Sequence, residues 1–462
     1  MSKAKASPAK RFFVEMLTRD IELADALLDL LDNCVDGALR TGPKEHARPY
    51  AGFEANIDIT SKGFRIQDNC GGIPRALAEE HAFRFGRKDK ERDQNLATVG
   101  VYGIGMKRAI FKLGTNCTIE SRHNADAFTV TIDQGWINSD DVWDLELTNT
   151  APNLKINGTS IEVNELHPSV AIAFDHDKGG FSEDFYQIVQ RHYSYIIEKG
   201  FQIKVNGRAV LASTLETLFD KTDFEKIEAI RPYVYEAEYD GVSVNLVMGL
   251  YEKLPTDKEQ EDSEKGVRNK ESAGWTIICN DRVVVAADKT RLTGWGEAGV
   301  PAYHSQFIAL AGIVVFKSND AIKLPVTTTK RGIDQNSELF GHVKEVMRDA
   351  LKHFTSFTNH WKGQSTERDE IQGFVEPVDM RSVALSIPDA KWKAVKNGIQ
   401  GRRYIPKLPE PITESKSRRI HYVKSVEDIA CIGSYLLDDD KALPADVGVA
   451  TFDWVLKKAK KV

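Results

Sequence analysis

The stretch "ALLDLLDNCVDGALR", residues 26–40, decides the fold because it is typical of one strongly apolar helix and yet carries several acids. On a helical wheel of about 100° per residue, the polar side chains share one narrow wedge and apolar side chains fill most of the remainder. Such a helix is buried on several sides. Its wedge must therefore face water or a polar cavity, because burying unpaired carboxylates is costly. The wedge consists of Asp25, Asp29, Asp32, Asn33 and Asp36.

Three of these residues stack along one face of the helix. Asp29, Asn33 and Asp36 are spaced i, i+4, i+7. One interpretation is a solvated stripe on an amphipathic helix. The other is a cleft wall that carries a base, an amide oxygen for a hard cation and a second carboxylate. Mg²⁺ takes oxygen ligands and bridges substrate phosphates, so a single Asn33 oxygen is sufficient if phosphates supply the other ligands.

A second cluster is "IQDNCGGIP", residues 66–74, which places Asp68 at the end of an expected strand, before Gly71 and Gly72. An acid at this place can accept a hydrogen bond from an exocyclic amine, and glycine lets the backbone approach a flat ligand closely. The same residues are also common in an ordinary turn.

A third cluster is "VGVYGIGMKRA", residues 99–109, a glycine-rich turn that leads into a helix. Gly100, Gly103 and Gly105 precede the helix, and Lys107 lies in its first turn. Backbone N–H groups at a helix start bind phosphate, and a nearby lysine adds charge. The spacing is not that of a P-loop, nor of a dinucleotide-binding fingerprint.

The composition narrows the class of protein. The chain has 462 residues, a net charge of −6 and 41% hydrophobic residues, which is enough for two or three domains with their own cores. Its five cysteines are scattered without a CxxC pair, so neither a zinc site nor a disulfide framework is expected. No run approaches the roughly 18 apolar residues of a membrane span, and the start of the chain lacks a signal-peptide core. We expect a cytoplasmic protein.

The pattern of strands and helices predicts an α+β protein of three parts. The first covers residues 1–210 and holds the three clusters, and the second is a smaller α/β domain over residues 211–362. Residues 363–462 are expected to hold an irregular, proline-bearing linker to about residue 410 and then a small, mostly helical module of unknown role.

Together, and in this order, the acid-and-asparagine helix, the Asp-Gly-Gly strand end and the glycine-rich turn resemble the GHKL ATPase superfamily. The likeness extends to "NGTSIEVNEL", residues 157–166, which resembles the Gly-Thr strand that closes the pocket in MutL. Residues 274–284 ("GWTIICNDRVV") and 324–334 ("LPVTTTKRGID") resemble the transducer domain of the MORC, MutL and topoisomerase branch. The resemblance implies a Bergerat-type α/β sandwich followed by an S5-like transducer domain, over roughly residues 10–360.

The resemblance also implies roles for the polar residues. Asp29 stands at the position of the general base that activates water, Asn33 would coordinate Mg²⁺, and Asp36 would support the pocket. Lys330 would reach in from the second domain and contact the γ-phosphate of ATP. The resemblance assigns the adenine and ribose contacts to Asp68, Gly72, Ile73 and Thr159, and the phosphate contacts to Gly100, Tyr102, Gly103, Ile104, Gly105, Met106 and Lys107.

Two positions depart from the family pattern. The base is usually glutamate, and Asp29 is one methylene shorter; displacement of a catalytic group by an ångström can cost on the order of 10²-fold in rate. Cys70 stands where the second box usually has glycine. ATP binding is therefore a firmer expectation than fast hydrolysis.

The implied function is a Mg²⁺-dependent ATPase that acts as a molecular switch. Nucleotide state would be coupled to closure of a charged lid (residues 84–95), to interdomain rotation and to ATP-dependent homodimerisation through the N-terminal segment "KRFFVEMLTRD". We expect a role in a DNA transaction or in bacterial anti-phage defence, with DNA or an effector protein as partner and no membrane. The alternatives are a chaperone-like ATPase that acts on protein clients and a nucleotide-binding scaffold that does not hydrolyse ATP.

Overall fold

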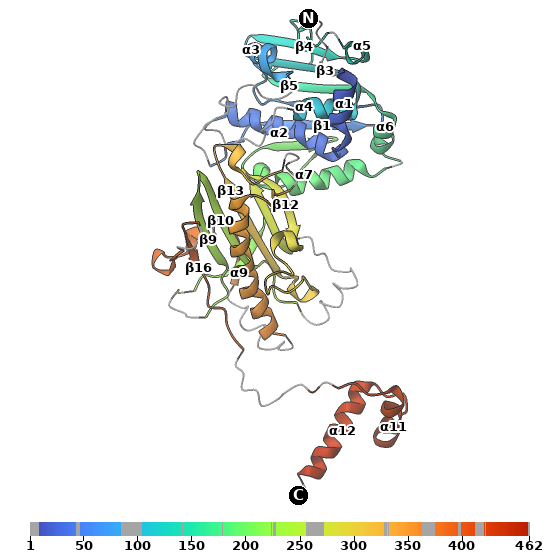
Figure 1. Ribbon diagram of the computed structural model, residues 1–462, viewed down its shortest axis with the longest axis vertical. Helices are drawn as coiled ribbons and strands as arrows, with labels where there is room; N and C mark the ends of the chain where they lie inside the picture. Colours follow the sequence, from blue (N-terminus) through green and yellow to red (C-terminus); the bar gives the residue numbers. More distant parts are fainter. Residues whose placement is uncertain are drawn as a thin grey trace, which may run out of the picture. The chain divides into compact units, whose positions relative to one another are not determined.

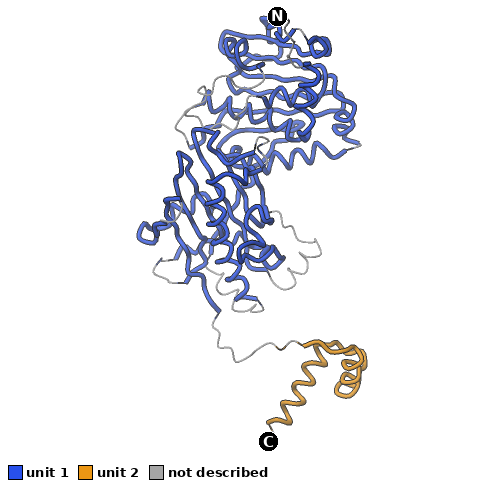
Figure 2. Tube along the Cα trace, viewed as in Figure 1, with its two compact units in different colours: residues 1–411 blue, residues 412–462 orange. Residues whose placement is uncertain are grey.

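The computed structural model of the chain divides into two compact units, residues 1–411 and residues 412–462, which are described separately (Figure 2). The residues that the structure describes are 9–42, 47–84, 104–140, 142–177, 179–222, 224, 228–255, 272–327, 330, 332–362, 375–395, 399–411, 420 and 422–460.

The larger unit has two parts, each a sheet with its helices, which are called the first and the second layer. The first layer contains a mixed sheet (Figure 1). Among the described residues this sheet has seven strands in the order β4-β3-β5-β2-β1-β6-β7, and β1 and β6 are the parallel pair. The strands are β1 (Glu54–Thr60), β2 (Gly63–Asp68), β3 (Gly114–His123), β4 (Asp126–Ile132), β5 (Gly158–Leu166), β6 (Gln202–Val205) and β7 (Arg208–Ala209). The helices are α1 (Lys10–Arg19), α2 (Leu23–Thr41), α3 (Arg75–Leu77) with the π-helical turn Ala78–Ala82, α4 (Gly105–Leu113), α5 (Gln134–Asn138), α6 (Pro168–Phe174) and α7 (Phe181–Glu198).

Helix α2 is the centre of this layer. Its leucines, such as Leu27 and Leu31, are fully buried in one continuous core with alternate residues of β1 and β2, for example Ile57 and Ile66. The helix ends where the backbone N–H of Gly42 donates to the carbonyl of Ala38. The stretch that is apolar around most of its girth is therefore a buried helix, as expected.

Helix α1 packs on the same layer through a buried lysine. Lys10 is 0% exposed, and its Nζ donates to the carbonyl oxygen of Trp136 at 2.8 Å and to that of Val142 at 2.5 Å. The ammonium also lies 3.8 Å from the Trp136 ring centroid. At the other end of α1, Lys112 Nζ donates to the carbonyl oxygen of Thr18 at 3.1 Å. The segment expected to be a dimerisation arm is thus held at both ends on its own domain.

The second layer is another mixed sheet with one long helix. The described residues form seven strands in the order β12-β11-β13-β10-β9-β16-β15, together with a separate β14–β8 pair. Helix α9 begins after Ser337, whose side chain accepts a hydrogen bond from the Phe340 N–H. The elements are β8 (Glu216–Asp220), β9 (Tyr233–Tyr239), β10 (Val242–Leu250), β11 (Gly274–Cys279), β12 (Arg282–Asp288), β13 (Leu310–Lys317), α9 (Glu338–His360), β14 (Val375–Asp379), β15 (Lys393–Val395) and β16 (Gly401–Tyr404).

The region between residues 363 and 410 differs from the expected linker. Strand β14 pairs with β8, and β16 pairs with β9 and with β15, the strand at this edge of the second sheet. The prolines of this region argue against strands when only the sequence is considered. Proline is nevertheless tolerated on edge strands and at strand ends. Pro377 lies in β14 opposite Leu218. The second layer therefore extends past residue 362 to about residue 411, and α+β remains the fold class.

The smaller unit is a pair of helices, α11 (Val426–Leu437) and α12 (Pro444–Ala459). Helix α11 begins at Ser425, whose hydroxyl accepts from the Asp428 N–H at 3.1 Å, and ends at Asp438 in the left-handed conformation. This matches the expected helical module. Within the described part of the chain, no helix is both long and apolar enough to cross a membrane.

Candidate functional site

Three of the four acids in the polar wedge of α2 are buried rather than solvated. Asp29, Asp32 and Asp36 are 4%, 1% and 2% exposed, whereas Asn33 is exposed. A solvated stripe is therefore excluded. Buried carboxylates need paired charges, so their partners define the site.

Asp29 is held by the start of helix α4. Arg108 Nη2 donates to Asp29 Oδ2 at 2.6 Å, and the arginine side chain is 12% exposed. Gly105, the first residue of α4, lies so close that a Cβ there would stand 3.1 Å from the Asp29 carboxyl carbon. The structure thus brings the expected base against the end of the expected phosphate-binding turn.

Asp32, on helix α2, is contacted by side chains from both layers. Tyr193 of α7 donates to Asp32 Oδ1 at 2.5 Å, and Arg282 of β12 donates to the same oxygen at 3.0 Å. Lys330 Nζ donates to Asp32 Oδ2 at 2.9 Å and lies 3.5 Å from Asp29 Oδ1. Lys330, which is expected to reach in from the second domain, therefore ends between two acids of α2.

The charges of this cluster reinforce one another. Burial alone raises the pKa of Asp32, but Lys330 and Arg282 outweigh it, so the pKa of this carboxyl lies below its usual value. Burial alone lowers the pKa of Lys330, but Asp32, Asp29 and Asp36 outweigh it and the pKa is raised. Asp32 and Lys330 thus stabilise each other's charge.

The region where Asp32, Arg282 and Lys330 meet is called the joint. The tip of the β11–β12 hairpin of the second sheet holds it in place. Asn280 and Asp281 have φ values of +46° and +67°, which turn β11 into β12. Lys199 Nζ lies 2.6 Å from Asp281 Oδ1, and Tyr50 donates to Asp281 Oδ2 at 3.3 Å. The ring of His192 in α7 lies 2.5 Å from the Val283 carbonyl oxygen. Contacts from several consecutive residues therefore seat the tip on the first layer.

The other end of the site lies where β2, β3 and β5 meet. Asp68 is 8% exposed, and its Oδ1 accepts from the Cys70 N–H at 2.7 Å and from the Thr159 N–H at 3.3 Å. Burial raises the pKa of Asp68 to about 6, against the opposing effect of these hydrogen bonds. Ile73 is held by its N–H, which donates to Ser121 Oγ at 2.7 Å. The structure therefore brings Asp68, Thr159 and Ile73 together where β2, β3 and β5 meet.

Glycine is required where these strand ends cross. Gly72 has φ +71°, and a Cβ there would lie 2.0 Å from the Arg122 carbonyl oxygen. A Cβ at Gly158 would lie 2.0 Å from the Asp68 carbonyl oxygen. Any side chain at these positions would therefore separate the strand ends. Cys70 occupies the usual glycine position without a positive φ, and its thiol is buried.

The structure describes the expected phosphate-binding turn only in part. Gly100, Tyr102 and Gly103 lie outside the described residues, as does most of the expected lid. Ile104 caps α4, Met106 is half-buried, and Lys107 is 5% exposed.

The donors near α2 fit a cation that arrives with a nucleotide. No group of three or more His, Cys, Asp or Glu side chains suited to a metal occurs in the part of the chain that the structure describes. Asn33 instead offers a single exposed amide. Mg²⁺ needs little more from protein when phosphates and water complete its oxygen shell.

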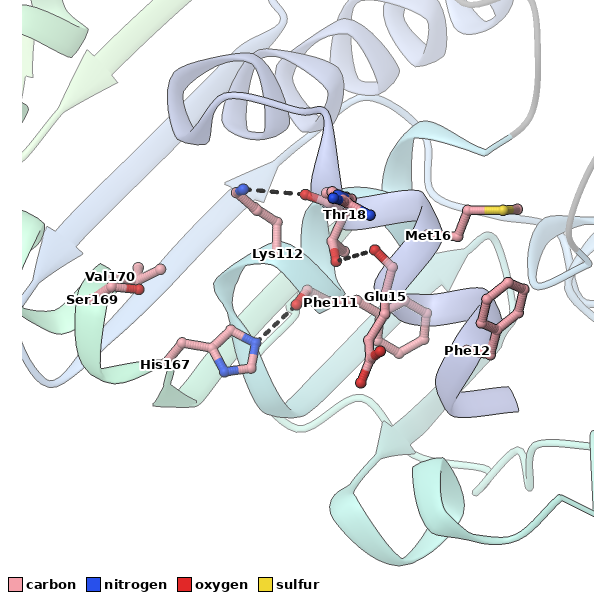
Figure 3. A pocket seen from close by; sticks show the side chains of 10 residues that line it. Phe12, Glu15, Met16, Thr18, Phe111, Lys112, His167, Ser169 and Val170 are labelled. Carbon is pink, nitrogen blue, oxygen red and sulfur yellow. Dashed lines mark hydrogen bonds between the residues drawn. The ribbon is translucent and has the colours of Figure 1, made fainter. Parts of the chain in front are cut away.

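A cavity of about 590 Å³ lies elsewhere, between α1, α4 and the start of α6 (Figure 3). Figure 3 shows Lys112, Thr18 and His167 around it, with Phe12 and Met16 at its α1 side. None of the acids of α2 lines this cavity. It is therefore separate from the candidate nucleotide site.

Several residues of the site have no motif that predicts them. Arg108 follows the lysine of the glycine-rich cluster, and Arg282 lies in a strand-like stretch. Asp32 belongs to the polar wedge, but its spacing suggests no partner. In retrospect, the position of Asp32 one turn from the expected base Asp29 indicates a buried ion pair, because a buried acid there must have a cation opposite it.

Comparison with protein families agrees with this geometry. No curated protein matches the chain. A family model described as "Histidine kinase-, DNA gyrase B-, and HSP90-like ATPase" matches residues 21–166, which hold α2, the Asp68 turn, α4 and β5. This match supports the GHKL superfamily for residues 21–166 and, with it, ATP binding by this part of the chain.

Proposed function

We propose that the chain is an ATP-hydrolysing switch whose nucleotide site lies between α2, α4 and the ends of β2 and β5. The observation that carries the proposal is the buried cluster of Asp29, Asp32 and Lys330, because it joins a cation of the loop before α9 to acids of helix α2. The family match supplies the ATPase class.

In this proposal the residues near Asp29 perform the chemistry. Asp29 accepts a proton from the attacking water, as a positioned general base does. Asn33 would hold Mg²⁺, and the bound ion would supply charge neutralisation for phosphoryl transfer. The N-terminus of α4 and Lys107 bind the phosphates, and Asp68 accepts a hydrogen bond from the adenine amine.

Lys330 makes the site responsive to the nucleotide. A γ-phosphate beside α2 competes with Asp29 and Asp32 for the ammonium. Transfer of Lys330 to the phosphate leaves Asp32 paired with Arg282, so the hairpin tip stays seated while the Lys330 loop shifts. Hydrolysis removes the competitor and returns Lys330 to the acids, which is a switch of a segment by γ-phosphate contacts.

One observation favours the alternative of a scaffold that does not hydrolyse ATP. Asp29 Oδ2 is bound by Arg108 at 2.6 Å, and Oδ1 faces Lys330 at 3.5 Å. A carboxylate with both oxygens occupied by cations has no free oxygen to accept a proton from water. Release of Oδ1 when Lys330 moves to the γ-phosphate resolves the conflict, and this is why we propose slow hydrolysis rather than none.

The client that we propose is DNA, in a DNA transaction or anti-phage defence, with ATP-dependent homodimerisation. This rests on the likeness of the second sheet to the MORC and MutL branch. A chaperone-like activity on protein clients is the alternative. Duplex DNA that raises the ATPase rate with a salt-dependent affinity supports the proposal, because contacts with DNA phosphates release counterions.

Calorimetry tests the nucleotide site directly. We expect Mg·ATP to release heat on binding to the wild type, and Asn33→Ala to weaken that binding. Asn336→Ala, in the turn before α9, is the matched control and should bind as the wild type does. The absence of heat with the wild type, or equal binding by Asn33→Ala, contradicts the proposal.

A further inference from the structure

The helix pair of the smaller unit exposes most of its apolar side chains. Among its described residues, only Gly433 of α11 and Val447 of α12 are buried within the two helices. Val449, Phe452 and Leu456 of α12 are 63%, 54% and 36% exposed. A pair of helices that buries so little apolar surface does not reach the stability of an independent domain and needs a further surface to cover it.

The contact between the two helices fixes which side of α12 is free. A Cβ on Gly433 would lie 3.3 Å from Val447 Cγ2, so α11 and α12 approach each other at this glycine. At about 100° per residue, Leu456 lies about 180° from Val447 around the helix. The face of α12 that carries Leu456 therefore points away from α11.

That free face has the spacing of a helix-packing seam. Intervals of 4, 3, 4 and 3 residues separate its members, which is the repeat of two helices that pack along their length. Phe452 lies at the centre and is flanked by smaller side chains on both sides. The seam consists of Ala445, Val449, Phe452, Leu456 and Ala459.

Most charges of α12 lie toward its two ends, and Asp453, beside Phe452, is the acidic exception in the middle. Asp446 lies in the first turn, after the acidic turn 438–440. Lys457 and Lys458 lie in the last turn, followed by Lys460. Two such helices in antiparallel orientation place each acidic end beside a basic end and oppose the helix dipoles. Parallel helices would place like charges together.

We propose that α12 pairs with α12 of a second copy of this chain, antiparallel and with Phe452 near the two-fold axis. A second copy fits because the seam is centred on Phe452 and each end carries the charge that complements the other end. This is the self-complementarity that a two-fold interface requires. The contact needs no nucleotide, so it is distinct from the proposed ATP-dependent contact through the N-terminal segment, and it goes beyond the proposed ATPase function.

The mass of the full-length chain in solution, measured by light scattering without nucleotide, tests the seam. We expect two chains for the wild type and one chain for Phe452→Asp. Val426→Asp, at a residue of α11 that is 82% exposed, is the matched control and should remain a dimer. ATP binding equal to that of the wild type verifies that Phe452→Asp leaves the larger unit folded. A monomeric wild type, or a dimeric Phe452→Asp, overturns the proposal.

Cysteine cross-linking tests the orientation. In a Cys431→Ser background, which removes an exposed thiol, chains with Ala445→Cys are mixed with chains with Ala459→Cys. We expect disulfides that join one variant to the other after oxidation. Disulfides between two Ala445→Cys chains show parallel helices and overturn the proposal. Failure to cross-link in any combination means that another surface covers the seam and overturns it as well.

Discussion

The two ends of the candidate nucleotide site are built in different ways. At the adenine end, Asp68 and Thr159 lie on neighbouring strands of one sheet and are held by backbone hydrogen bonds. At the joint end, Asp32 is held by side chains that are 250 and 298 residues away along the chain, Arg282 and Lys330. The first end depends on close backbone approach, and the second depends on paired charge.

This difference suggests that the two ends of the site have different functions. An end fixed by strand pairing is rigid and suits recognition of an invariant base. An end fixed by ion pairs between two layers responds to any new anion, because a phosphate competes directly with the carboxylates. The following variants test this contrast, from the largest expected effect to the smallest.

Asp29→Asn tests whether the joint end performs the chemistry. Loss of a general base typically costs about 10²–10⁴ in rate. We expect kcat for ATP hydrolysis to fall by this factor, with the Kd for ATP almost unchanged, in a steady-state phosphate-release assay. Asp25→Asn, on the same face of α2, is the control and should retain activity. Full activity of Asp29→Asn would show that Asp29 is not the general base.

Arg282→Met tests the charge pairing of the joint. Removing one partner of a buried ion pair typically costs about 3–5 kcal/mol, because the other charge is left without compensation. We expect a loss of this size in the free energy of unfolding, measured by urea denaturation. Arg402→Met breaks a half-exposed pair with Glu236 and should cost less than about 1 kcal/mol. Equal costs for the two variants would mean that Asp32 does not depend on Arg282.

Gly72→Ala tests the backbone approach at the adenine end. Gly52 also has a positive φ, +87°, but no atom lies within 4 Å of a Cβ placed there. Gly52→Ala should therefore show the backbone strain alone, about 1–2 kcal/mol. We expect Gly72→Ala to cost about 1–3 kcal/mol more, because its Cβ meets the Arg122 carbonyl. Thermal unfolding of the two variants measures the difference, and equal losses would argue against the close approach.

The raised pKa of Asp68 predicts a pH dependence confined to the adenine end. Because the pKa of this buried carboxyl is about 6, the anionic form that accepts a hydrogen bond from adenine is lost below that pH. We expect the Kd for ATP to rise about tenfold per pH unit below 6. Asp68→Asn should lack this inflection and retain only the titration of the phosphates, as measured by calorimetry from pH 5 to pH 8.

The sign of the stability effect is the reverse of that for binding. The pKa of Asp68 is raised above its unfolded value, so protonation favours the folded state. Its contribution is fully present below about pH 4 and is lost as pH rises through 6. Wild type and Asp68→Asn should therefore differ in the pH dependence of unfolding over this range, and parallel curves would contradict the burial effect.

The same contrast explains what the sequence predicts. The α+β class, the buried α2 and the strand end at Asp68 follow from local patterns of apolar and glycine residues. The partners of Asp32 do not, since no periodicity indicates that Arg282, the first residue of β12, contacts α2. Strands β14 and β16 are missed for a related reason: they are short, and their partners β8 and β9 are distant in sequence.

The central claim is that Lys330 links the γ-phosphate to the acids of α2, and calorimetry with two nucleotides tests it most directly. A charged hydrogen bond of about 1.5–3 kcal/mol corresponds to roughly a 10- to 100-fold change in affinity. We predict that Lys330→Ala weakens binding of a non-hydrolysable ATP analogue by this factor and leaves ADP binding unchanged, while Lys323→Ala alters neither. Equal effects of Lys330→Ala on both nucleotides, or no effect on either, would contradict the account.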